Sequence, residues 1–129
     1  MTPKEYNDMP EGDTKLAVRC AITCGWVASL QHSIEQNGLR VFVEDPAKDG
    51  WKCARFNPFT DPSIPYGLIG RGVTGVSQSP SGGFFARSGR DMLRYSFAIR
   101  ESKTHAIINA FCAADPQGHW ARFMKGGEV

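Results

Sequence analysis

The stretch ARFNPFTDPSIPYGLIGRG, residues 54–72, is the connector around which the rest of the chain is organised. It holds three prolines, three glycines and two phenylalanines, a composition typical of a turn-rich crossing segment rather than of a helix or strand. The Asn-Pro step forces an extended residue, and an aspartate just after it can accept backbone hydrogen bonds at the start of a turn. We therefore predict a structural corner in which Phe56 and Phe59 anchor the connector in the core and Asp61 caps a short helix.

Size and composition predict one globular domain. The chain has 129 residues, of which 41% are hydrophobic and 22% charged, close to the average for a soluble domain. It contains no apolar run near the roughly 20 residues that a membrane helix needs. The first residues, MTPKEYNDMPEGD, lack the charged-then-apolar pattern of a secretion signal. We expect a cytosolic protein that does not enter a membrane.

Before the connector, the pattern predicts a helix followed by a hairpin. Residues 10–24 have a broad apolar face, with Asp8 as a plausible cap and a glycine after the end. Residues 26–36 fit a short helix or an irregular strand, and the pattern leaves both open. Residues 39–45 alternate as a strand and should pair antiparallel with residues 51–56, with turn signals at Asn-Gly and Asp-Gly steps.

After the connector, three more strands and a helix are predicted. VTGVSQ (73–78), GFFAR (83–87) and MLRYSFAIR (92–100) read as strands of a mostly antiparallel sheet. The segment 102–115 reads as a helix capped by Ser102, with an apolar stripe. The fold class is thus α+β, an antiparallel sheet flanked by helices in an αβα sandwich-like arrangement. We expect a single domain over 1–129, with aromatic anchors and a loose tail from about 124 to 129.

The cysteines and histidines do not form a recognisable catalytic or metal-binding constellation. Cys20, Cys24, Cys53 and Cys112 should be reduced, mostly buried thiols in a cytosolic chain. No second closely spaced ligand pair accompanies Cys20 and Cys24, so we expect no metal and no cofactor. Cys112 lies two turns from the nearest histidine on one predicted helix, too far for a direct hydrogen bond. We expect a protein that is not an enzyme.

Charge is distributed unevenly along the chain. Residues 1–50 hold five basic and eight acidic side chains, whereas residues 51–129 hold ten basic and five acidic. Five arginines of the basic half fall within thirty residues, and arginine suits bidentate contact with phosphate or carboxylate. With the aromatic residues among them they predict a ligand- or partner-binding patch formed by Arg71, Phe84, Phe85, Arg87, Arg90, Arg94 and Tyr95. The alternative is a solvated surface with ordinary charge scatter.

Four glycines surround the first of these arginines in GLIGRGVTG (67–75). Glycines let backbone amides approach an anion, but the segment has neither the lysine-serine pair nor the strand-to-helix context of a phosphate loop. As a phosphate motif it is weak. On 92–100, Arg94 and Arg100 alternate with apolar residues, so we expect them to project from the solvent face of the strand.

The order of these features resembles the NinX family of small phage proteins. The residues that carry the resemblance are EYNDMPEGDTKLAVRCAITCG (5–25), FNPFTDPSIPYGLIGRGVTGVS (56–77), GGFFAR (82–87) and SKTHAIINAFCAAD (102–115). The chain departs from the family pattern at 62–67, where two prolines break or shorten any helix, and at 88–98, which inserts an arginine-rich segment. The resemblance implies an origin in a phage genome and an αβα sandwich, and it carries no catalytic residues.

The resulting functional hypothesis is a non-enzymatic, phage-encoded binding protein in the cytoplasm of the infected bacterial host. In its first version the patch sequesters a small, anionic, nucleotide-like signal and so counters a host defence system. In its second version the same patch docks on a host or defence protein and blocks it. The sequence leaves a homo-oligomer open. Nucleic-acid binding is disfavoured, because the helices are not basic and the chain is near neutral.

Overall fold

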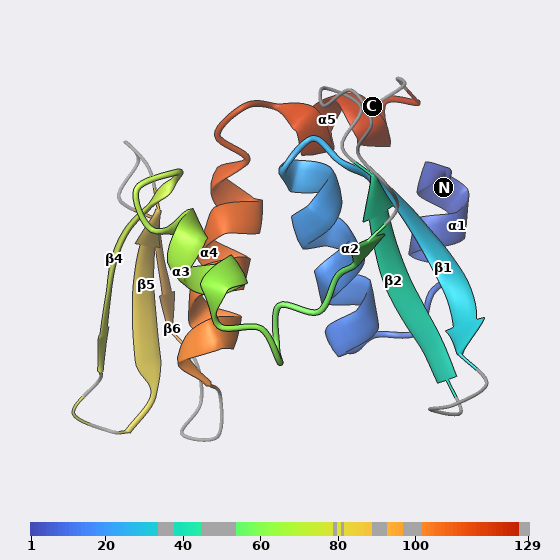
Figure 1. Ribbon diagram of the computed structural model, residues 1–129. Coiled ribbons are helices and arrows are strands. Elements are labelled where there is room, and N and C mark those ends of the chain that lie inside the picture. Colours follow the sequence, from blue (N-terminus) through green and yellow to red (C-terminus); the bar gives the residue numbers. More distant parts are fainter. Residues whose placement is uncertain are drawn as a thin grey trace. The chain divides into compact units, whose positions relative to one another are not determined.

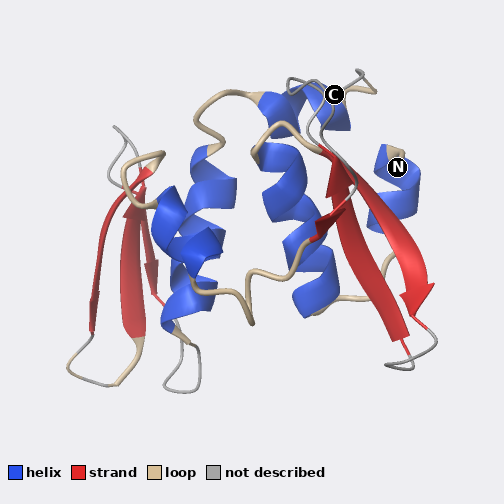
Figure 2. Ribbon diagram, viewed as in Figure 1, coloured by secondary structure: helices blue, strands red, loops and turns tan. Residues whose placement is uncertain are grey.

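The chain folds into two compact units, each with its own sheet. The computed structural model describes residues 1–33, 38–44, 54–78, 80, 82–88, 93–96 and 102–126. Unit 1 comprises Met1–Asn57 and Gln117–Val129, and unit 2 comprises Pro58–Pro116. Each unit holds a three-stranded antiparallel sheet packed against helices (Figures 1 and 2). The α+β class with antiparallel strands is confirmed, and the division of the strands between two sheets is a feature that the linear pattern does not reveal.

The N-terminal segment of unit 1 forms two helices, α1 (Pro3–Asn7) and α2 (Asp13–Thr23). A capping box begins α1: the hydroxyl of Thr2 accepts the backbone N–H of Glu5 at 3.2 Å, and the Glu5 carboxylate accepts the N–H of Thr2 at 3.3 Å. The prediction of one longer helix capped by Asp8 is wrong at its start. Because the capping box starts a separate helix upstream, Asp8 lies at the C-terminal end of α1 instead.

The sheet of unit 1 consists of β1 (Val27–Ser33), β2 (Gly38–Glu44) and β3 (Ala54–Arg55) in that order. All its pairings are antiparallel, and α2 packs against β1 and β2. Of the segment 26–36, which the sequence leaves open between helix and strand, the described residues Val27–Ser33 form a strand. The predicted pairing of the strands on either side of the second turn is confirmed, whereas the turns at 37–38 and 49–50 lie wholly or partly outside the described residues.

The C-terminal segment returns to unit 1 as helix α5 (His119–Met124), which packs on α2. Phe123 is buried, and the Trp120 ring lies between Phe123, at 5.5 Å, and Tyr6, at 4.8 Å. Gly25, with a φ of 90°, ends the α2 turn so close to the His119 ring that a Cβ there would lie 2.8 Å from Nε2. The sequence predicts the aromatic anchors here but not the helix, which extends to the first residue of the expected tail.

The connector has the predicted core anchor at Phe56, whereas Phe59 is only half-buried and the N-cap of the short helix is Pro62, one residue after Asp61. Phe56 is 4% exposed, and its ring meets that of Trp26 edge to face at 5.5 Å. The Asp61 carboxylate accepts both the N–H (3.1 Å) and the hydroxyl (2.7 Å) of Ser63, the first residue of α3 (Ser63–Leu68). The two prolines at 62 and 65 do not abolish this six-residue helix, because a proline in the first turn removes no intrahelical hydrogen bond.

Unit 2 is built on a second antiparallel sheet, formed by β4 (Val73–Gln78), β5 (Phe84–Ser88) and β6 (Leu93–Ser96). Helix α4 (Lys103–Ala114) packs against all three strands and against α3. The hydroxyl of Ser102 accepts the N–H of the residue three positions on at 3.1 Å, so the predicted cap is confirmed. Buried residues of this unit include Val73 and Ala86 on the strands, and Ala106, Ile107, Ile108, Ala110, Phe111 and Cys112 on α4.

The described cysteines behave as small core residues. Cys20, Cys24 and Cys112 are buried thiols, exposed by 8% or less. This confirms the prediction for these three, and Cys53 lies outside the described residues. Within the described part of the chain, no helix is long and apolar enough to cross a membrane.

Candidate anion-binding site

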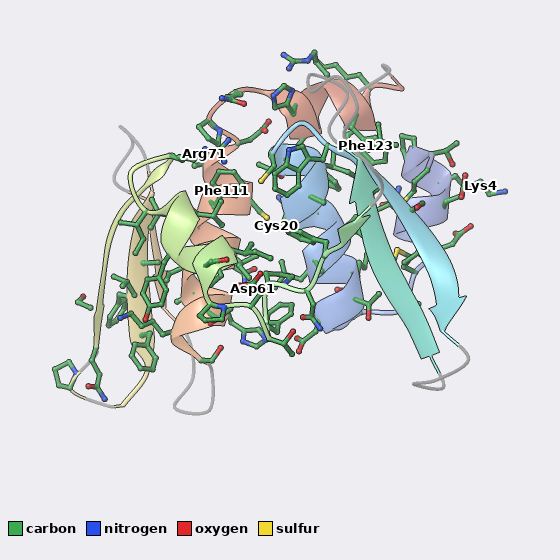
Figure 3. All side chains as sticks on the ribbon, in the orientation of Figure 1. Lys4, Cys20, Asp61, Arg71, Phe111 and Phe123 are labelled. Atoms are coloured by element: carbon green, nitrogen blue, oxygen red, sulfur yellow. The ribbon has the colours of Figure 1, made fainter. Side chains whose placement is uncertain are left out.

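All seven residues of the predicted patch belong to unit 2, but the structure describes them unequally. Arg71 is exposed in the turn that enters β4, as Figure 3 shows. It lies at the end of the sheet where β4 begins opposite Ser88, the last residue of β5. Arg90 lies outside the described residues. The remaining five positions are on β5 and β6, where the backbone register fixes their relation.

The register sets two of the predicted arginine positions directly opposite each other. Arg87 on β5 pairs with Arg94 on β6, and on its other side Arg87 pairs with Gly75 on β4. Directly paired positions in antiparallel strands share one face of the sheet, with Cβ atoms about 4.5–5.5 Å apart. One cross-strand row therefore runs glycine, arginine, arginine. Among the described residues, a Cβ added at Gly75 would meet nothing within 4 Å.

The next row on the same face is aromatic and hydroxylated. Ser77 pairs with Phe85, and Phe85 pairs with Ser96. Because side chains alternate along a strand, Phe85 shares its face with the position two residues on, Arg87. Phe85 is half-buried and Ser77 is exposed. The face thus combines an aromatic ring and serine positions with the arginine pair.

Two predicted site positions fall on the opposite face. Tyr95 pairs with Ala86, which is fully buried on the side where α4 packs, and Phe84 alternates with Phe85. The residues of the predicted patch therefore lie on two opposite faces of the sheet. Arg87, Arg94 and Phe85 positions are brought together, whereas Phe84 and Tyr95 belong to the helix-covered face.

The glycine-rich segment before β4 already makes hydrogen bonds and a close packing contact within the fold. These limit its ability to bind an anion through its backbone amides. The N–H of Gly70 donates to the carbonyl of Val73 at 2.7 Å, and the N–H of Arg71 donates to the carbonyl of Leu68 at 2.9 Å. Gly72, at a φ of 139°, lies so close to Pro116 that a Cβ would approach its Cγ to 2.9 Å. Two amides are thus already bonded, and Gly72 serves close packing on the end of α4.

The described residues contain two hydrogen-bonded histidines, and each has a local structural explanation. The Nδ1 of His105 shares a hydrogen bond with the Ser102 hydroxyl that caps α4, and the Phe59 ring lies 4.6 Å from the imidazole. His119 Nε2 bonds the Gln117 side chain at 2.9 Å, and its Nδ1 accepts from Arg122 at 2.6 Å. Among the described residues, no group of three potential ligands is placed to hold a metal ion.

Comparison of the chain with protein-family models, with curated proteins and with solved structures gave no significant match. The resemblance to the NinX family therefore stays a prediction.

Proposed function

We propose that this chain is a non-enzymatic binding protein that holds a small anion on the sheet face carrying Arg87 and Arg94. The observation that supports it most directly is the register that pairs these two positions. Like charges directly opposite each other on a sheet are destabilising. A bound phosphate or carboxylate that accepts hydrogen bonds from both guanidinium groups offsets this repulsion, and such charge-assisted bonds are among the strongest in proteins.

The neighbouring positions define which anion fits. Gly75 has no side chain, so the ligand can approach the backbone of the sheet beside Arg87. Phe85 lies one row away on the same face and offers an aromatic surface for a planar ring. Ser77 and Ser96 flank Phe85 and supply hydroxyl donors and acceptors. An anion carrying a base-like ring, as in a nucleotide, matches this combination better than a bare inorganic ion.

The proposal extends to the biological role of this binding. A nucleotide-like signal held in this way is withdrawn from its receptor, which is how a phage protein would counter a host defence system that depends on such a signal. This part is supported by the sequence resemblance to small phage proteins and by the aromatic-arginine chemistry of the site, and it places the protein in the cytoplasm of an infected bacterium.

Calorimetric titration of AMP, pyrophosphate and cyclic dinucleotides into the intact chain tests the proposal. We expect at least one nucleotide to bind, and the double variant Arg87→Ala/Arg94→Ala to lose that binding while keeping its melting temperature. Lys4→Ala/Lys125→Ala is the matched control, because it removes the same charge from exposed positions of unit 1. Equal losses in the two variants, or no binding by any of these anions, would remove the arginine pair from the mechanism.

A second candidate function, docking on a partner protein, is favoured by a different feature of unit 2. Tyr66 on α3 is 55% exposed, Ile69 beside it is 37% exposed, and the Lys103 ammonium lies 5.4 Å from the Tyr66 ring centre. Exposed tyrosine is enriched at interface hot spots. If Tyr66→Ser abolishes capture of a host protein while nucleotides fail to bind, docking replaces sequestration as the function.

A further inference from the structure

The outer strand of the unit 1 sheet has a neighbouring strand on one side only. β1 stands first in the order β1-β2-β3, and it pairs with β2 along all seven of its residues. Among the described residues, no backbone hydrogen bond joins Val27–Ser33 to a segment other than β2. A strand directs alternate N–H and C=O groups to its two sides, so an edge strand keeps one such row available for another strand.

The sequence of β1 carries none of the residues that protect an edge. Proteins commonly protect an edge strand with lysine or another charged side chain, with proline, or with a bulge. Residues 27–33, VASLQHS, contain no lysine, arginine, aspartate, glutamate or proline, and their register with β2 is continuous. Val27, at the start of the strand, is 40% exposed. The composition of this edge therefore permits a further strand to pair with it.

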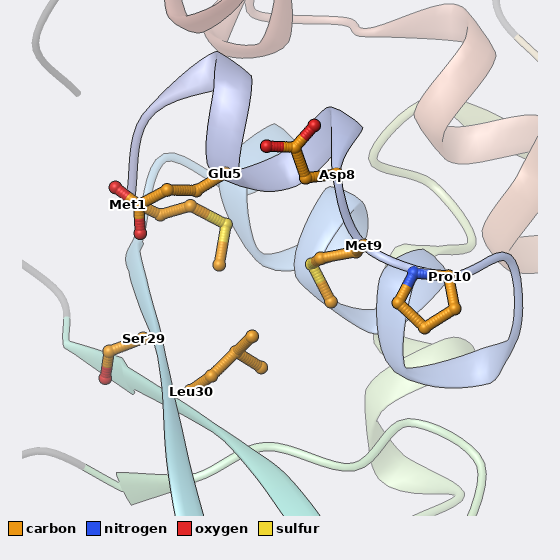
Figure 4. Close-up of a pocket in the computed structure, with 7 residues that line it drawn as sticks. All are labelled: Met1, Glu5, Asp8, Met9, Pro10, Ser29 and Leu30. Carbon is orange, nitrogen blue, oxygen red and sulfur yellow. The ribbon is translucent and has the colours of Figure 1, made fainter.

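A pocket of about 560 Å³ adjoins the same strand. Ser29 and Leu30 of β1 line one side of it, and Met1, Met9 and Pro10, which flank α1, line the other (Figure 4). The side chains of Met1, Met9 and Leu30 point towards the same space in Figure 4. Methionine is flexible and polarisable, so surfaces that contain it accept apolar groups of varied shape.

The charged groups of the lining do not select one sign of charge. The carboxylates of Glu5 and Asp8 belong to exposed residues, and the lining also includes Met1, which carries the backbone ammonium group. The apolar side chains that meet in the pocket are therefore the basis for choosing its occupant. A large apolar side chain that displaces water from them gains the usual free energy of apolar burial.

We propose that β1 accepts an extended peptide segment of a partner protein as a further strand of the unit 1 sheet, with one large apolar side chain of that segment in the pocket. In this mode of recognition, main-chain hydrogen bonds supply affinity, and pockets for alternate side chains supply specificity. The free edge of β1 provides the first, and the pocket between Leu30 and Met9 provides the second. The site is independent of the arginine-bearing face of unit 2.

Titration of the isotope-labelled chain with four acetylated and amidated peptides tests the proposal by NMR. The peptides have the sequence TVTXTVT, in which X is leucine, methionine, phenylalanine or alanine, because threonine and valine favour an extended backbone without adding charge. We expect the leucine peptide to shift the amide signals of residues 27–33 and the methyl signal of Met9. It should bind about tenfold more tightly than the alanine peptide, a ratio typical of burying one large aliphatic side chain.

Two N-methylated forms of the leucine peptide test the backbone pairing separately. One carries N-methyl groups on its odd-numbered residues, and the other carries them on its even-numbered residues. An added strand directs only one of these two sets of N–H groups towards β1. We therefore expect one form to bind and the other to lose binding, and equal affinity of the two forms would overturn strand addition.

Met9→Gln, of similar length but polar, should weaken binding of the leucine peptide severalfold. Met124→Gln is the matched control, because it makes the same change at a 38% exposed position of unit 1 outside the lining. Equal weakening by the two variants, or equal affinity for the leucine and alanine peptides, would overturn the role of the pocket. Unshifted β1 amide signals with all four peptides would overturn peptide binding. Protection of these amides that rises with protein concentration in the absence of peptide would assign the edge to a second copy of the chain instead.

Discussion

Replacing Phe123 by alanine tests whether the C-terminal helix α5 is an integral part of unit 1. The Phe123 side chain is 3% exposed and packs against Trp120, which in turn meets Tyr6 of α1. Deleting a buried phenylalanine ring costs about 3–5 kcal/mol, a cost that includes the lost ring contacts. A total of that size is a large fraction of the 5–15 kcal/mol by which a typical domain is stable. A loose tail predicts a change within about 0.5 kcal/mol.

Urea denaturation followed by tryptophan fluorescence measures this cost selectively. Trp26 and Trp120 are in unit 1, and the sequence of unit 2, residues 58–116, contains no tryptophan, so the emission reports on unit 1. With an m-value of about 2 kcal/mol/M, the expected loss lowers the urea midpoint by about 2 M. Met124→Ala, at the exposed neighbouring position of the same helix, is the control and should move the midpoint little. Equal midpoints for the two variants would refute the packing of α5.

Three further substitutions test the connector, the entry to β4 and the α4 cap. Phe56→Ala should lower the free energy of unfolding by about 3–5 kcal/mol, and an unchanged fluorescence midpoint would place its ring outside the core. Gly72→Ala should lower the melting temperature more than Gly70→Ala. Both positions have positive φ, at a strain of about 1–3 kcal/mol for alanine, but only a Cβ at Gly72 meets Pro116, so equal losses would contradict the close packing. Ser102→Ala should cost about 0.5–2 kcal/mol by thermal denaturation, and Ser102→Asp, which keeps a capping oxygen, should restore most of it.

The sequence predicts those elements whose signals are local. Ser102 and the apolar stripe that follows it specify α4 because a cap and a helical period are both readable from neighbouring residues. Alternation likewise predicts β4 and β5 within one residue. Thr2 and Glu5 form an equally local capping box that specifies α1. This helix is not predicted because Asp8 and Pro10 resemble the start of a single longer helix.

Elements that depend on distant partners are harder to predict. Helix α5 is short and opens after a glycine without a side-chain cap, and its buried face exists only because Tyr6 and α2 supply the other side. β1 is a strand because it pairs along its whole length with β2. Its own pattern of apolar residues fits a helix as well as a strand. The division of the strands between two sheets also depends on distant partners, because one sheet packs against α2 and the other against α4.

The face of the sheet on which Arg87 lies follows from core packing rather than from the arginine itself. Side chains alternate with a period of two, so a one-residue slip of β5 would exchange the positions of Ala86 and Arg87 between the two faces. Ala86 is fully buried where α4 packs, and an arginine there would bring an unpaired charge into an apolar interior at a cost of several kcal/mol. The irregularity between Val73 and Gly75 then brings a glycine, rather than a threonine, opposite Arg87. Burial under α4 thus fixes the face on which Arg87 lies, and pairing with β6 sets Arg94 opposite it on the same face, where two like charges repel each other.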